Sequence, residues 1–198
     1  MNLTCFQGLR RSLLLTAALL LTATVHAQSG SAAPRVKLAT SAGDIVIELY
    51  PDKAPRTVEN FLQYVKDRHY DGTVFHRVID GFMIQGGGMT ANLQPKPTRA
   101  PIPIESANGL KNERGTLAMA RTANPNSATA QFFINVANNA FLNHTAPTPQ
   151  GWGYTVFGKV VEGLDVVDKI RVVPTGNLGM YQNVPLSPIT INAATVLP

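Results

Sequence analysis

Residues 75–88, "FHRVIDGFMIQGGG", combine residue types that could act on a bound ligand, although they contain no serine or cysteine nucleophile. Arg77 supplies a permanent cation, Phe82 and Met83 supply apolar surface, and Gln85 supplies a side-chain amide. No pair of carboxylates accompanies them. A reaction at this stretch would therefore depend on binding and on a fixed positive charge, without a covalent intermediate on the protein.

Rotation about an X-Pro peptide bond is a reaction that needs this set of groups. Its barrier is about 20 kcal/mol because resonance gives the C–N bond partial double-bond character. In the twisted transition state the prolyl nitrogen regains its lone pair and can accept a hydrogen bond. A guanidinium that donates this bond only in the transition state lowers the barrier. We therefore expect Arg77 to be the donor, Phe82 and Met83 to hold the proline ring, and Gln85 to bind the flanking backbone.

Motifs of other reaction classes are incomplete. The four histidines form no HxH or HExxH pattern, so no metal is expected. Gly86 to Gly88 are not followed by Lys-Ser/Thr, and we interpret them as a close passage of the backbone instead of a phosphate loop. Ser127 lacks a G-x-S-x-G context. His76 could be a general base, but its position on a predicted strand favours a buried histidine. A hydrolase that uses His76 or Ser127 is a third hypothesis, after the two functions given at the end of this subsection.

The first 27 residues have the pattern of a secretory signal peptide. Arg10 and Arg11 precede an apolar run at 13–25, which is too short to span a bilayer comfortably, and small residues allow cleavage after Ala27. We predict export to a bacterial periplasm by the general secretory route, with the twin-arginine route as the alternative. After cleavage we expect no stable association with the membrane.

The rest of the chain is predicted to be a short flexible leader at 28–34 and a single domain at 35–198. Its single cysteine, Cys5, lies in the predicted signal peptide, so the mature chain would have no disulfide. The net charge of +5 is mild and no basic run is present. Nucleic acid is therefore not an expected partner, and we expect a monomer.

Apolar periodicity predicts a mostly β domain with two helices. Short strands are expected in a hairpin over 35–50, through 74–78, at 115–121, 131–136 and 154–160, and at 190–197; the helices are expected from Pro55 onward and at 161–170. Many short strands with two amphipathic helices favour a closed antiparallel barrel whose ends the helices seal.

Four motifs along the domain resemble one family. "FHRVI", "GFM" and "QGG" in the first stretch, followed by "GTLAMAR", "QFFI" and "VFGKVVEG", resemble the cyclophilin family of peptidyl-prolyl cis-trans isomerases, and the resemblance extends from about Val36 to the last strand. With the signal segment, the chain looks like the periplasmic bacterial branch. The resemblance implies an eight-stranded closed antiparallel barrel capped by two α-helices, with no cofactor or metal.

The resemblance also implies roles for individual residues. Arg77, Phe82 and Gln85 match catalytic positions, and Gln85 is expected to steady Arg77; the implied substrate-binding positions are Met83, Ala120, Arg121, Gln131, Phe133, Phe141, Leu142 and Tyr154. Phe141 stands where many eukaryotic members have a tryptophan, and Tyr154 stands where they have a histidine. Neither position supplies the transition-state donor, so we expect isomerase activity to survive and affinity for the family's cyclic-peptide immunosuppressant to be in doubt.

Two functions fit these residues. The main hypothesis is a periplasmic isomerase that acts on proline-containing, unfolded or partly folded exported polypeptides. The alternative is a chaperone or adaptor that binds proline-containing segments in the same groove, with isomerisation incidental. Loss of the catalytic arginine or the presence of a second domain would favour the alternative. The sequence retains Arg77, and we expect a single domain.

Overall fold

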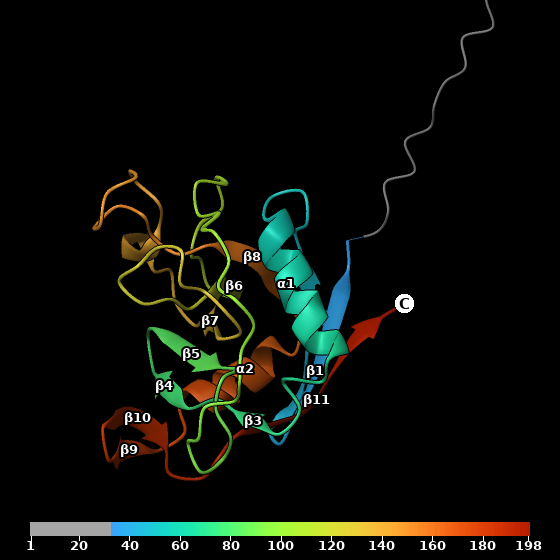
Figure 1. The fold of residues 1–198 in the computed structure, drawn as a ribbon. Coiled ribbons are helices and arrows are strands. Elements are labelled where there is room, and N and C mark those ends of the chain that lie inside the picture. The colour runs from blue at the N-terminus through green and yellow to red at the C-terminus, as the bar shows by residue number, and fades with distance from the viewer. Residues whose placement is uncertain (1–32) are drawn as a thin grey trace, which may run out of the picture. The chain divides into compact units, whose positions relative to one another are not determined.

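The computed structural model describes residues 33–198. The predicted signal peptide and residues 28–32 of the predicted leader lie outside the described residues. Figure 1 shows a curled sheet with two helices and a separate hairpin. The elements are β1 (Arg35–Thr40), β2 (Gly43–Leu49), α1 (Pro55–Lys66), β3 (Thr73–Val74), β4 (Arg77–Ile79), β5 (Met83–Gly86), β6 (Thr116–Met119), β7 (Phe132–Asn135), η1 (Ala140–Leu142), β8 (Val156–Glu162), α2 (Leu164–Arg171), β9 (Thr175–Leu178), β10 (Tyr181–Pro185) and β11 (Thr190–Leu197).

The main sheet has nine strands in the order β3-β11-β1-β2-β8-β6-β7-β5-β4, and its named pairs are antiparallel. The prediction of a closed eight-stranded barrel was wrong, because the sheet is an open half-barrel whose edge strands β3 and β4 do not pair. Phe75 and His76 separate these two edges in the chain, so the predicted single strand through 74–78 is divided in two. Both residues are buried, which breaks the alternation that a continuous half-buried strand requires.

The two helices cover different parts of the sheet. Helix α1 packs against β11, and α2 packs against β2, β4 and β5. Pro55 occupies the first turn of α1, as predicted, where a missing N–H costs nothing. The carboxylate of Glu105 accepts hydrogen bonds from the N–H groups of Arg56 and Thr57 at 3.2 and 2.9 Å. A residue distant in sequence therefore caps the helix, because Ala54 has no side-chain oxygen to do so.

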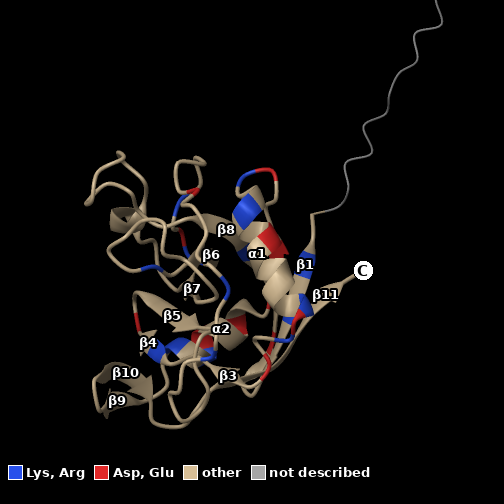
Figure 2. Ribbon diagram, viewed as in Figure 1, with Lys and Arg blue, Asp and Glu red and all other residues tan. Residues whose placement is uncertain are grey.

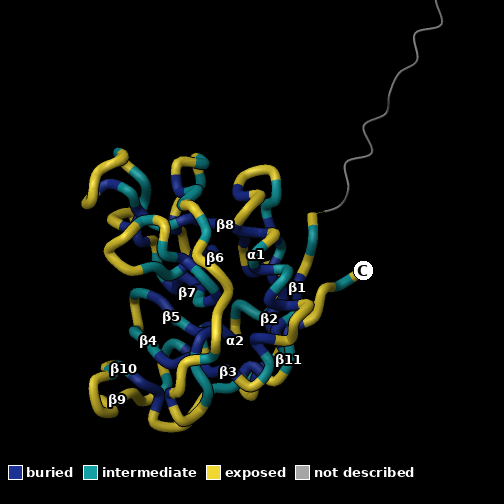
Figure 3. Tube along the Cα trace, viewed as in Figure 1, coloured by how far each residue is buried: buried dark blue, intermediate teal, exposed yellow. Residues whose placement is uncertain are grey.

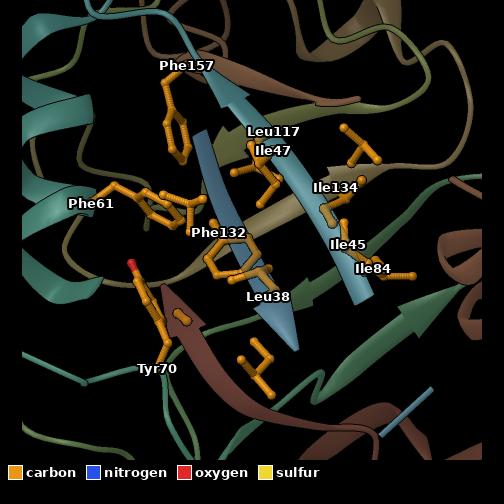
Figure 4. Packing of buried hydrophobic residues seen from close by; sticks show 14 of the residues in the cluster. Leu38, Ile45, Ile47, Phe61, Tyr70, Ile84, Leu117, Phe132, Ile134 and Phe157 are labelled. Carbon is orange, nitrogen blue, oxygen red and sulfur yellow. The ribbon is translucent and has the colours of Figure 1, made fainter. Parts of the chain in front are cut away.

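The hydrophobic core lies between the sheet and α1. In Figure 4, Phe61 from α1 meets Phe132 from β7 and Tyr70 from the loop before β3. The rings of Phe61 and Tyr70 both lie edge-on to Phe132, at 5.7 and 5.5 Å between centroids. Figure 3 shows the buried positions along the strands and the exposed ones mainly in the loops and the β9–β10 hairpin. This packing makes the sheet a rigid support for residues on its other face.

The strands β9 and β10 form a second, two-stranded sheet that the sequence did not predict. Residues 172–189 carry no charge, Leu178 and Met180 are exposed at the turn, and only Val184 and Pro185 of the two strands are buried, so the apolar residues do not alternate with polar ones as in a half-buried strand. Strand β5 and the short helix η1 were also missed. No helix among the described residues is both long and apolar enough to cross a membrane. Figure 2 shows basic and acidic residues interspersed over the elements.

Candidate active site

A row of side chains crosses the outer face of the sheet from β4 to β7. Arg77 lies opposite Gln85 in the β4–β5 pair, and Gln85 lies opposite Phe133 in the β5–β7 pair. Directly paired residues share a face of the sheet, whereas successive residues alternate between faces. Phe132 and Ile84 therefore point into the core while their neighbours Phe133 and Gln85 point outward. The alternation of the sequence thus separates the residues of the site from those of the core.

An open hollow of about 110 Å³ lies over this row. Its volume is well below the roughly 300–1,000 Å³ of pockets for drug-sized ligands, so it suits a single side chain. Phe133 meets Tyr154 edge-on at 5.6 Å between ring centroids. The residues that line the hollow are Arg77, Phe82, Met83, Gln85, Ala120, Arg121, Phe133, Leu142 and Tyr154.

Two of the predicted site residues lie outside this hollow. Gln131 lines an adjoining hollow that shares Gln85, Ala120 and Arg121 with the first. Phe141 is 73% exposed, and its ring lies 5.5 Å from that of Phe82 at the back of the site. The other predicted residues are brought together, although they come from β4, β5, β7, η1 and three loops.

Gln85 is held by a different partner from the one expected. Its Nε2 donates to Oε1 of Gln131 at 2.9 Å, and no side-chain hydrogen bond joins Gln85 to Arg77 in the part of the chain that the structure describes. Gly88 permits this arrangement, since a Cβ at that position would lie 2.3 Å from Cγ of Gln131. The glycines do serve a close passage of the backbone, as predicted.

A buried asparagine network supports the wall of the site and was not found from the sequence. Nδ2 of Asn139 donates to the backbone oxygen of Phe82 at 2.8 Å and to Oδ1 of Asn135 at 2.7 Å. Asn135 in turn donates to Thr116 and to Asn112. Buried amides are retained only when their hydrogen bonds are satisfied, so this network fixes the backbone that presents Phe82. The sole signal in the sequence was the density of asparagines between 108 and 143.

The two arginines of the hollow carry charge without an acidic partner. Neither Arg77 nor Arg121 forms an ion pair with any residue between 33 and 198. Arg121 is instead held by a contact with the Tyr154 ring, 4.6 Å from the guanidinium carbon to the centroid, and by its Nε, which donates to the Gly153 oxygen at 2.9 Å. The hollow is thus apolar at its base and cationic at its rim.

The candidate hydrolase residues are engaged elsewhere. The hydroxyl of Ser127 donates to the Asn124 oxygen and accepts from Thr122 within one loop. His76 does not line the hollow, its Nδ1 is buried without a partner, and burial lowers its pKa to about 4. These contacts agree with the interpretation of His76 as a buried neutral histidine and give the hydrolase hypothesis no support.

Burial of His76 makes the stability of the protein dependent on pH. An unfolded histidine binds a proton near pH 6.5, whereas His76 in the folded protein does so only at about 4. The free energy of unfolding therefore falls as the pH decreases from about 6.5 to about 4. We expect His76→Gln to reduce the loss of Tm between pH 7 and pH 4.5 by on the order of 5 °C, as measured by calorimetry.

His69 contributes to the same pH dependence in the same direction, because burial also lowers its pKa, and the nearby Lys96 adds to the effect. The variant His76→Gln should therefore retain part of the wild-type loss, and His69→Gln should remove a smaller part. His144→Gln is the matched control, since this ring is only half-buried. A His76→Gln variant that loses as much Tm as the wild type would contradict the assignment.

No group of three or more His, Cys, Asp or Glu side chains among residues 33–198 could hold a metal ion. The geometry places two guanidinium groups, those of Arg77 and Arg121, around a partly apolar hollow on a rigid sheet. The profile of the family described as "Cyclophilin type peptidyl-prolyl cis-trans isomerase/CLD" matches residues 35–196. The chain belongs to the cyclophilin family, and it is a peptidyl-prolyl cis-trans isomerase.

Bacterial members of the family are similar to this chain over most of its length. The chain is 62% identical over 162 residues to the Streptomyces antibioticus peptidyl-prolyl cis-trans isomerase cyp18, covering 82% of this chain and 98% of that protein. It is 59% identical over 157 residues to peptidyl-prolyl cis-trans isomerase B of Escherichia coli K12, covering 79% of this chain and 96% of that protein. The match therefore covers nearly the whole length of both relatives.

Solved structures agree with the fold. A cyclophilin-type isomerase of Cryptosporidium parvum superposes with a TM-score of 0.69 at 27% identity, covering 84% of this chain and 98% of that chain. The same protein crystallised in the presence of the dipeptide Ala-Pro gives a TM-score of 0.68 at 28% identity, covering 83% and 99% of the two chains.

Proposed function

We propose that this isomerase catalyses rotation without covalent chemistry, with Arg77 donating a hydrogen bond to the prolyl nitrogen in the twisted transition state. The observation that carries this proposal is a guanidinium, free of any ion pair among the described residues, at the edge of an apolar hollow. A salt bridge would hold the guanidinium on a carboxylate and would cancel its charge. Arg77 keeps both its charge and its donors for the substrate.

The apolar residues have a separate task in this mechanism. Phe82, Met83 and Phe133 form a surface against which a pyrrolidine ring can pack, and Met83 and Phe133 are almost fully buried in a cluster of their own. Holding the ring still while the preceding residue turns lets the binding energy of the ring support the rotation. The hydrogen bond from Arg77 then distinguishes the transition state from the ground state.

The segment that follows β6, Ala120 and Arg121, is proposed to bind the peptide backbone. The N–H of Ala120 already donates to the Gln131 oxygen at 3.0 Å. An extended peptide must therefore pair with the Ala120 carbonyl or with the N–H of Arg121, in the manner of an added β-strand. The free amide atoms of Gln85 and Gln131 line the same hollow as Ala120 and Arg121 and can form hydrogen bonds with the backbone of the same peptide.

The proposed substrates are proline-containing segments of unfolded or partly folded exported polypeptides. The Ala-Pro dipeptide used with the Cryptosporidium parvum relative supports the proline-containing class. The predicted signal peptide supports export and a periplasmic site of action. We expect the protein to act there as a monomer without stable membrane association.

Two measurements test the proposal. The wild-type protein should accelerate the relaxation of a short X-Pro peptide from cis to trans. In NMR titrations that follow the amides lining the hollow, a peptide with alanine in place of the proline should bind far more weakly than the X-Pro peptide. Equal binding of both peptides would overturn the assignment of the hollow. Separately, the full chain expressed in its host should be released by osmotic shock; retention with cytoplasmic markers would overturn the periplasmic assignment.

A further inference from the structure

The hollow next to the proline site is rich in hydrogen-bond donors, and polar atoms make up about half of its lining. It adjoins the first hollow through Gln85, Ala120 and Arg121. Thr129 and Gln131 line its other side. A peptide whose proline lies beside Arg77 would extend across this second hollow, because the two hollows share a wall.

Three donors in the second hollow have no partner among residues 33–198. Oε1 of Gln131 accepts from Gln85, which leaves the Nε2 group of Gln131 unused. The hydroxyl of Thr129 makes no hydrogen bond, since only the backbone oxygen of this residue is bonded, to Asn60. Arg121 uses its Nε and Nη1 atoms on backbone oxygens of Gly153 and Thr122 and leaves Nη2 unused. Donors that line one hollow without a protein partner suit a ligand group that accepts hydrogen bonds.

The charge of Arg121 is fixed in place and is not neutralised. The two backbone hydrogen bonds and the contact with Tyr154 leave the guanidinium little freedom to turn away. Five of the arginines between 33 and 198 form ion pairs, namely Arg35, Arg68, Arg99, Arg114 and Arg171.

The arginines of this part of the chain that have no ion pair are Arg56, Arg77 and Arg121, and the last two line the hollows. No aspartate or glutamate among the described residues lines either hollow. A cleft that carries two unpaired cations and no anion attracts negative ligands.

We propose that the second hollow binds an acidic side chain of the substrate, aspartate or glutamate, located within three residues of the proline. This inference rests on the proposed function, because it requires the proline itself to occupy the hollow beside Arg77. The carboxylate takes the hydrogen bonds of Arg121, Gln131 and Thr129 and gains the charge of the guanidinium. The isomerase therefore acts preferentially on X-Pro bonds next to an acidic residue.

The expected preference is moderate and depends on salt. Arg121 is half-exposed, so the gain from a carboxylate is that of a partly screened ion pair, about 1 kcal/mol. This corresponds to a roughly fivefold higher kcat/KM for a glutamate peptide than for its glutamine counterpart. At 1 M salt the Debye length falls to about 3 Å, and most of the preference should disappear.

The test compares peptides that differ only in one glutamate or glutamine, placed in turn at each of the three positions on either side of a central X-Pro bond. The ratio of kcat/KM for the glutamate and glutamine peptides is measured for each position, so a general loss of activity in a variant cancels. We expect a ratio of about five at one position for the wild type, a ratio near one for Arg121→Gln, and an intermediate ratio for Arg121→Lys. Arg56→Gln is the matched control, since it removes an unpaired arginine remote from the hollows, and its ratio should equal that of the wild type.

The outcomes separate this inference from the proposed function. If the wild type isomerises the glutamine peptides but shows a ratio of one at every position, the acidic preference is wrong and the isomerase mechanism stands. A ratio of five that survives in Arg121→Gln also overturns the inference. If no glutamine peptide is isomerised faster than in buffer, the proposed function fails first.

Discussion

Replacement of Arg77 by alanine should lower kcat/KM for an X-Pro peptide by about 10²–10³-fold, the usual loss when one preorganised donor to a transition state is removed. Peptide affinity should fall much less, because the apolar hollow of Phe82, Met83 and Phe133 is unchanged. The hydrogen bond is made mainly in the transition state, so its loss appears in kcat instead of KM. Coupled cis/trans relaxation kinetics and a peptide titration give the two values.

Arg77→Lys is the matched variant for this prediction. It keeps the charge but not the planar guanidinium, so partial activity would show that charge contributes and geometry decides the remainder. Arg77 is not in an ion pair with residues 33–198, so neither change should alter Tm by more than a few degrees. An Arg77→Ala protein as fast as the wild type would remove the basis of the mechanism. If an Arg77→Ala protein without isomerase activity still restored the phenotype of a deletion strain, the chaperone or adaptor hypothesis would be favoured.

Alanine at Phe132 should give the largest loss of stability. The side chain is fully buried and meets Phe61, Tyr70 and Phe75 edge-on. Removal of such a ring costs about 3–5 kcal/mol through lost burial and the cavity that remains. Urea unfolding followed by circular dichroism should show a lower midpoint with an unchanged slope.

Alanine at the neighbouring Phe133 is the matched control, because it makes the same chemical change on the opposite face of β7. Phe133 belongs to the smaller cluster under the proline hollow, so its removal should cost less stability but raise KM for X-Pro peptides. A Phe132→Ala protein that is as stable as Phe133→Ala, or a Phe133→Ala protein with unchanged KM, would show that the two faces are not divided as described.

The sequence predicted the strongly periodic parts of the fold correctly. The hairpin of β1 and β2, the start of α1 at Pro55 and the strand β11 were expected because apolar residues alternate or recur at helical spacing there. The division between β3 and β4 at Phe75 and His76 was missed. Two consecutive buried residues look the same in sequence whether they interrupt a strand or belong to a strand that is buried on both faces. The hairpin β9–β10 was missed, because it is held by pairing and by a contact with β4 and presents few buried side chains.

The candidate site was predictable as a set of residues and not as a geometry. Arg77, Phe82, Met83 and Gln85 lie within nine residues of sequence, so their chemistry could be considered together. The partner of Gln85 could not be found in this way, because Gln131 reaches it only through the pairing of β5 with β7. The asparagine network and the unpaired donors of the second hollow depend on contacts between loops, which no local pattern records.

The place of β11 in the sheet has a consequence for the order in which the protein can fold. This strand, residues 190–197, lies between β1 and β3, which belong to the first half of the chain. Until it is available, β3 cannot join β1 and β2, although these two strands pair directly with each other. Such long-range pairing slows folding, which suits the proposed export by the general secretory route, since that route threads an unfolded polypeptide.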